Sequence, residues 1–195
     1  MTVAPILSDR REWTVEDLAD LPAALPYELI NGRLIVPSPT TLHQDLMGDV
    51  WLALRANCPP EYVVSMDQSL RINRRNEPRP DVVAIRVKHA NRSPAPVEDA
   101  VLAVEIISPD STFRDMYGKA RVYAAAGVAT YWVIDPLHEP MTLTEMLLSP
   151  QRPEYEFGVH TSDVFTTERP WKVTIDLPAL AARRAALLKV IAHPA

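Results

Sequence analysis

Hydrophobic residues are densest between Val101 and Pro136, where two apolar runs flank a segment of helical character. The first run is VLAVEII (101–107), which has the length and the β-branched content of a buried strand. The second run is TYWVI (130–134), and Gly127 before it indicates where the intervening helix ends. The order strand, helix, strand predicts a βαβ unit.

The hydrophobic spacing on either side of this unit predicts further elements. Residues 27–37 (YELINGRLIVP) predict a tight hairpin, because apolar residues flank Asn31-Gly32, the strongest two-residue turn signal. Residues 40–57 place apolar side chains at helical spacing and predict an amphipathic helix. The other expected elements are a short helix near 14–21, strands within 62–72, 81–87, 141–148, 153–159 and 171–177, and a C-terminal helix at about 178–192.

This order of elements predicts an α/β (α+β) protein built on a mixed sheet. The chain has 195 residues, of which 47% are hydrophobic, and this suits one globular domain over residues 1–195. Residues 1–11 form a lead-in without a pattern. The 19 prolines and 5 glycines favour rigid turns, so no interior linker is expected to divide the chain.

Composition narrows the function classes. No apolar run is long enough to cross a bilayer, and the first residues lack the pattern of a signal peptide. Cys58 is the only cysteine, which excludes an internal disulfide and a thiolate cluster, so a cytoplasmic protein is expected. The formal net charge of -5 disfavours broad, non-specific binding of nucleic acid, so any such site must be local.

Glu105 interrupts the apolar run of the first central strand and needs an explanation, because burying a charge is costly unless it is compensated. Asp81 begins another predicted strand, and the two carboxylates converge if these strands pair. Paired oxygen ligands suit Mg²⁺ or Mn²⁺. Lys119, from the following helix, could offset charge that grows on a phosphate. These groups indicate metal-assisted phosphodiester hydrolysis.

Each of these residues also has a purely structural interpretation. Asp81 could cap a turn, and Glu105 could pair with an arginine such as Arg79. Lys119 could form an exposed pair with Asp115 at i,i+4 spacing.

The remaining polar candidates could likewise have either a functional or a purely structural role. Glu28, in the first hairpin strand, could belong to the site or pair with Arg33 across the turn. His43 lies in the first turn of the amphipathic helix, where a solvated or capping histidine is more common than a site residue. The arginines before Asp81 could form a solvated loop or bind phosphate; they are Arg71, Arg74, Arg75 and Arg79.

The segments YELINGRL, RPDVV, VEIIS, a helical D-x-x-x-K and GVATYWVIDP together resemble the Uma-two family of restriction endonucleases. That family belongs to the PD-(D/E)XK nuclease superfamily, and the resemblance covers roughly residues 12 to 180. It implies a restriction-endonuclease-like mixed sheet flanked by helices, with a metal ion at the sheet edge. A fold alone does not fix an activity.

The resemblance also implies a role for each site residue. Asp81, Glu105 and the main-chain carbonyl of Ile106 would bind the metal ion. Ile107 stands where the superfamily has its lysine, and Lys119 would supply that function from the helix. Glu28 would bind a second metal ion or a water on the metal.

The function expected from these features is hydrolysis of DNA phosphodiester bonds by an endonuclease, with one or two Mg²⁺ (or Mn²⁺) ions and a Mg-activated water. DNA is the expected partner, through Arg74, Arg75 and Arg79, and such folds often act as homodimers. Two alternatives remain open. One is a binding module of the same fold with little turnover, and the other is a phosphoesterase for a different phosphate substrate.

Overall fold

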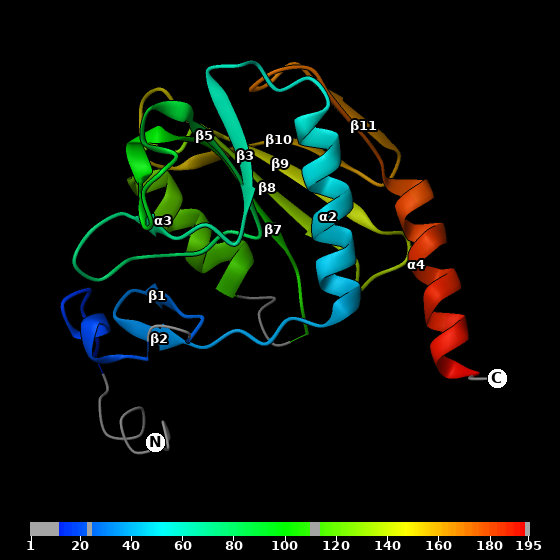
Figure 1. Cartoon of the computed structure of the whole chain (residues 1–195). Helices are drawn as coiled ribbons and strands as arrows, with labels where there is room; N and C mark the ends of the chain where they lie inside the picture. The colour runs from blue at the N-terminus through cyan, green and yellow to red at the C-terminus, as the bar shows by residue number, and fades with distance from the viewer. Residues whose placement is uncertain (1–11, 23–24, 110–113, 194–195) are drawn as a thin grey trace.

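A six-stranded mixed sheet forms the centre of the computed structural model, which describes residues 12–22, 25–109 and 114–193 (Figure 1). The strand order is β10-β9-β8-β7-β5-β3. Strands β7 (Ala100–Ile106) and β8 (Thr130–Asp135) are parallel, and the other neighbours are antiparallel. The parallel pair requires a crossover, and the connection carries α3 (Ala120–Ala125). The predicted βαβ unit is therefore present.

Helices cover the two faces of this sheet. Helix α2 (Thr41–Arg55) places Leu46, Val50 and Leu54 in one hydrophobic core, together with residues of β5, β7 and β8. Helix α3 contributes Tyr123 to the core on the opposite face. Helix α4 (Leu177–Ala192) lies beside α2 in Figure 1 and ends the described chain. None of the described helices has the length and apolar content that a bilayer crossing requires.

The remaining elements are short. The other strands of the large sheet are β3 (Tyr62–Met66), β5 (Val82–Arg86), β9 (Thr142–Leu148) and β10 (Tyr155–Thr161). Three two-stranded sheets pair β1 (Glu28–Ile30) with β2 (Arg33–Ile35), β4 (Leu70–Arg71) with β6 (Ala95–Pro96), and β11 (Val164–Thr167) with β12 (Val173–Asp176). The single-turn elements are η1 (Asp17–Asp20), η2 (Val87–His89), η3 (Val97–Asp99) and the π-helical η4 (Arg114–Lys119).

Several elements predicted from the sequence have different boundaries in the structure. The strand expected over 62–72 is two strands, because Asp67 adopts a left-handed conformation (φ 51°) that ends β3. The helix expected near 14–21 is only a 3₁₀ turn, and strand β11 was not predicted. The C-terminal helix starts at Leu177. The lead-in over residues 1–11 lies outside the described residues.

The predicted hairpin is present and is attached to the loop that precedes β5. Asn31 and Gly32 both have positive φ (51° and 77°), which favours the tight turn. Leu29 and Glu77 exchange two backbone hydrogen bonds of 3.1 and 2.8 Å. The Glu77 side chain is fully buried and accepts a 2.7 Å bond from Arg71 Nε. These contacts fix the position of strand β1 relative to the large sheet.

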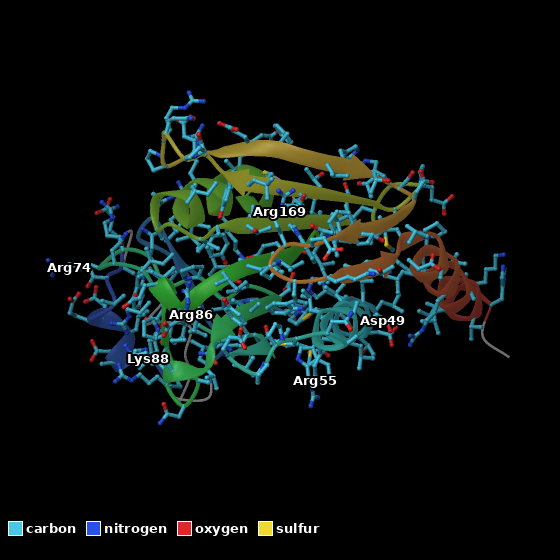
Figure 2. All side chains as sticks on the ribbon, turned by 90° about the horizontal axis from the view of Figure 1, so that it is seen from above. Asp49, Arg55, Arg74, Arg86, Lys88 and Arg169 are labelled. Carbon is cyan, nitrogen blue, oxygen red and sulfur yellow. The ribbon has the colours of Figure 1, made fainter. Side chains whose placement is uncertain are left out.

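Charged side chains outside these contacts lie mostly at the periphery. Figure 2 shows Arg55, Arg74 and Lys88 on the outer surface of the molecule, and all three are exposed. The charged residues that are buried are few by comparison, and several of them gather at one end of the sheet.

Helix α3 ends in a glycine cap. Replacing this glycine should have the opposite effect on stability to replacing a glycine inside helix α2. Gly127 has φ 84°, its N–H donates to Ala124, and Val128 donates to Tyr123. A Cβ at Gly127 would meet no atom within 4 Å, so the cost of Gly127→Ala is conformational, about 1–2 kcal/mol of unfolding free energy. Gly48→Ala in α2 also meets open space and should stabilise by about 0.5–1 kcal/mol. Urea unfolding measures both, and destabilisation by both substitutions would contradict this account.

Candidate active site

A cavity of about 580 Å³ opens where β5 begins and β7 ends, between the β1–β2 hairpin and the start of α2. Its charged lining residues come from segments far apart in the sequence. They are Glu28, His43, Asp67, Arg79, Asp81, Glu105, Lys119 and Arg184. All four acidic and basic residues predicted as catalytic line this one cavity.

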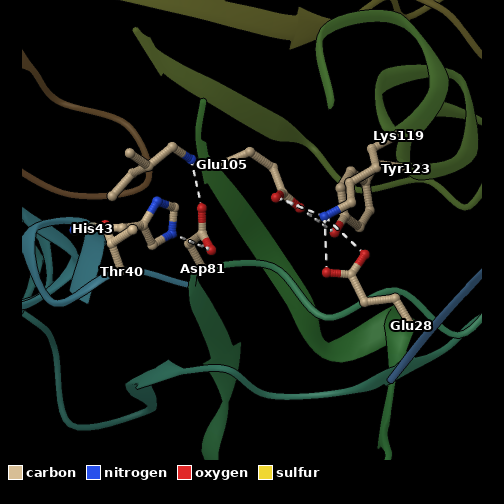
Figure 3. A network of polar contacts seen from close by, with 8 residues as sticks. Glu28, Thr40, His43, Asp81, Glu105, Lys119 and Tyr123 are labelled. Atoms are coloured by element: carbon tan, nitrogen blue, oxygen red, sulfur yellow. Dashed lines mark hydrogen bonds and ion pairs between the residues drawn. The ribbon is translucent and has the colours of Figure 1, made fainter. Parts of the chain in front are cut away.

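Lys119 lies between two of the predicted acids (Figure 3). Its Nζ is 2.7 Å from Glu105 Oε2 and 2.9 Å from Glu28 Oε2. The Lys119 and Glu105 side chains are only 3% and 2% exposed, so this is a buried cluster of charges. The three residues come from η4, β7 and β1. The ammonium of Lys119 therefore offsets the two carboxylates whose burial would otherwise be costly.

This geometry contradicts the structural interpretations of the same residues. Lys119 is buried, so it is not half of an exposed pair; the Asp115 side chain lies outside the described residues. Glu105 pairs with Lys119 instead of Arg79. In the hairpin, Glu28 is opposite Ile35 and contacts Lys119, so it does not pair with Arg33.

Tyr123 also contacts Glu105. Its hydroxyl donates a 2.9 Å hydrogen bond to Glu105 Oε1. Burial, followed by the negative charge of Glu105, raises the pKa of Tyr123 well above its usual value, so the hydroxyl stays protonated. Tyr123 follows Lys119 by four residues and thus lies on the same helical face. That spacing was the available sequence signal.

Asp81 lies directly before β5. Strands β5 and β7 pair Val82 with Val104, so extending this register by one residue places Asp81 opposite Glu105. The Asp81 carboxylate accepts a 2.6 Å hydrogen bond from the backbone N–H of Ile106. Its other oxygen, Oδ1, lies 3.1 Å from His43 Nε2.

His43 therefore belongs to the site, which its position in the sequence did not favour. Thr40 caps helix α2 by accepting from the backbone N–H of His43. The cap fixes the first turn of the helix, from which the imidazole of His43 reaches Asp81.

Asp67 was not predicted and lines the same cavity. Its backbone N–H donates to the carbonyl of Asp81, and its φ of 51° is unusual for a residue other than glycine. Burial and the nearby charge of Asp81 raise the pKa of the Asp67 carboxyl. The sequence signal for Asp67 depends on knowing that β3 pairs with β5, which aligns Met66 with Val82.

The arginines that precede Asp81 have different surroundings. Arg74 Nε lies 3.1 Å from Glu16, and Arg75 lies 3.1 Å from Glu12, both on exposed side chains. Arg79 is the member of this group that lines the cavity.

Comparison with known proteins agrees with this fold. The model of the Uma2 family, described as "Putative restriction endonuclease", matches residues 15–167. The chain belongs to the Uma2 family. Comparison with curated proteins gives no match. A crystal structure described as a putative nuclease belonging to DUF820, from Anabaena variabilis, is similar with a TM-score of 0.67 and 17% identity over 88% of this chain and 98% of that one. The predicted nuclease-like fold is therefore confirmed.

The buried charge cluster predicts that this Uma2 protein depends on Lys119 for stability. Lys119→Met leaves two buried carboxylates without their cation and should lower the unfolding free energy by about 3–5 kcal/mol. Adding Glu105→Gln should recover part of that loss, because one uncompensated charge is removed. Lys189→Met, at an exposed position of α4, is the control and should change stability little. Equal unfolding free energies for Lys119→Met and Lys189→Met in urea would refute the role of Lys119.

Proposed function

We propose that this protein is a metal-dependent endonuclease that hydrolyses phosphodiester bonds in DNA. The observation that carries the proposal is the buried Glu28–Lys119–Glu105 cluster in the same cavity as Asp81. Charged groups that are buried and line a cavity are typical of functional sites. Membership in the Uma2 family supports the nuclease class.

The donor chemistry of the cavity fits a hard divalent cation. Four carboxylates line it, those of Glu28, Asp67, Asp81 and Glu105, against three cationic side chains. Carboxylate oxygens suit Mg²⁺ or Mn²⁺. No group of three or more His, Cys, Asp or Glu side chains in the described ranges is placed so that these side chains alone could hold a metal ion. A site that uses two carboxylates and a main-chain carbonyl does not need such a group.

Asp81 and Glu105, together with the main-chain carbonyl of Ile106, would hold the ion. When bound, Mg²⁺ or Mn²⁺ supplies Lewis acidity, which activates water and neutralises charge on a phosphate. His43 and the N–H of Ile106 orient the Asp81 carboxylate, and Tyr123 orients that of Glu105.

Lys119 supplies positive charge beside the position where the phosphate would react. Its ammonium lines the cavity and is kept in place by Glu105 and Glu28, so it needs little reorganisation during the reaction. We assign it the stabilisation of the negative charge that grows on the phosphate oxygens. Glu28 holds Lys119 and is the candidate for a second metal ion.

Three further parts of the proposal come from the sequence. Membership in the Uma2 family supports DNA as the substrate, and the sequence-based expectations of a cytoplasmic location and a homodimer are part of the same proposal. A homodimer would present two cavities to the two strands of a duplex.

The proposal predicts metal-dependent cleavage of DNA. Purified protein should cut plasmid and single-stranded DNA in Mg²⁺ or Mn²⁺ and should be inactive in EDTA. Asp81→Asn should lower the cleavage rate by at least about 100-fold, because one ligand loses its charge. Asp163→Asn, at an exposed position between β10 and β11, is the matched control and should cleave like the wild type.

Two outcomes of this cleavage assay would count against the proposal. Equal cleavage by wild type and Asp81→Asn would mean a contaminating nuclease or another site. Metal-dependent DNA binding without cleavage would favour the alternative of a binding module.

Metal binding can be tested without turnover. Mn²⁺ should raise the melting temperature of the wild type, because an ion that binds only the folded state stabilises it. Glu105→Gln should show a clearly smaller rise at the same Mn²⁺ concentration, whereas Asp163→Asn should match the wild type. Identical shifts in wild type and Glu105→Gln would remove Glu105 from the metal site.

A further inference from the structure

Arg79 is a cation in the cavity without a protein partner among the described residues. Its Nε atom is buried and makes no hydrogen bond, and its guanidinium forms no ion pair with that part of the chain. Buried polar atoms are normally satisfied, so a buried donor of this kind needs an explanation. The guanidinium lies in the same cavity as Asp67 and Asp81, and its charge acts on the Asp67 carboxyl.

The backbone around Arg79 is held on both sides, so the position of this side chain is built into the fold. Pro78 and Pro80 are both buried and flank it, and each has a fixed φ. The carbonyl of Pro78 accepts a 2.9 Å hydrogen bond from Leu70, and the carbonyl of Asp81 accepts one from Asp67. The backbone of so constrained a segment needs little ordering when a ligand binds.

The neighbouring arginines show what a structural role looks like in this segment. Arg71 pairs with the buried Glu77, Arg74 with Glu16, and Arg75 donates to Glu12. Each of them stabilises the attachment of the hairpin or the N-terminal segment. Arg79 has no such acidic partner in the described structure and points to a ligand instead.

We propose that Arg79 binds the non-bridging oxygens of a phosphate group in a nucleic-acid strand, next to the reacting phosphate. The guanidinium fork matches two phosphate oxygens, and such charge-assisted pairs are among the strongest hydrogen bonds in proteins. Glu105 and Glu28 already engage Lys119, so Arg79 supplies a separate positive charge in a cavity rich in carboxylates. A cavity of about 580 Å³ has the size of a site for a small ligand, which suits one or two nucleotides of a strand. This inference rests on the proposed function for the identity of the strand, but the anion site itself does not.

The test is binding of a fluorescent single-stranded oligonucleotide in Ca²⁺, with a gel to confirm that the strand stays intact. Arg79→Gln should weaken binding at least about tenfold. It should also reduce the slope of log K against log salt by about 0.7, the value for one lost phosphate contact on a single strand. Arg152→Gln is the matched control, since Arg152 is exposed and pairs with Glu154, and it should leave both quantities unchanged.

A second variant covers the risk that Arg79→Gln does not fold. Arg79→Lys keeps the charge and loses the fork, so it should weaken binding about threefold or more while the salt slope stays that of the wild type. Wild-type affinity in both Arg79 variants would overturn the inference, whatever the cleavage assay shows.

Inorganic phosphate separates this inference from the proposed function. Phosphate should raise the melting temperature of the wild type more than that of Arg79→Gln. If the wild type binds phosphate through Arg79 but neither binds nor cuts any strand, the nuclease proposal fails and the anion site stands. Equal phosphate shifts in wild type and Arg79→Gln would overturn the anion site.

Discussion

The position of one buried ammonium group determines the arrangement of the candidate site. Lys119 Nζ lies within 3 Å of carboxylate oxygens of both Glu28 and Glu105, and all three side chains are at most 10% exposed. Two carboxylates this close would repel each other without the cation, and the cation would be costly to bury without them. The charges compensate one another only while β1, β7 and η4 keep their relative positions.

Those positions depend on contacts that are remote from the charges themselves. The hairpin that carries Glu28 is held by backbone bonds between Leu29 and Glu77, and the buried Glu77 is itself paired with Arg71. Glu105 is fixed within β7, a central strand of the large sheet. The parallel pairing of β7 and β8 requires a crossover, and Lys119 lies in η4 near the beginning of that crossover, after the end of β7 that carries Glu105. The contacts that pack the fold are therefore also the contacts that position the charged groups of the site.

The cavity divides its polar groups into two sets. Glu105 and Glu28 engage Lys119, whereas Asp81 engages His43 and the N–H of Ile106. Each carboxylate is therefore oriented before any ligand binds, which is the preorganisation that catalytic sites use. Membership in the Uma2 family makes nuclease chemistry the natural interpretation of this arrangement.

The sequence by itself determined the elements whose signal is local. The Asn31-Gly32 turn, the amphipathic helix α2 and the βαβ unit follow from residues that are neighbours in the chain. A glutamate inside an apolar run also identified Glu105 as a buried charge. The resemblance to the Uma2 family added the expectation that Glu28, Asp81 and Glu105 lie together, which no pattern of neighbouring residues could provide.

Only the tertiary structure decided which groups meet. His43 reaches Asp81 across 38 positions of the sequence, and no local pattern encodes that contact. Asp67 enters the cavity because β3 ends beside β5, and a single left-handed residue divides what had looked like one strand. Arg79 differs from Arg74 only in its surroundings. The identity of each side chain is known from the sequence, whereas its burial and its contact partners depend on how the fold packs.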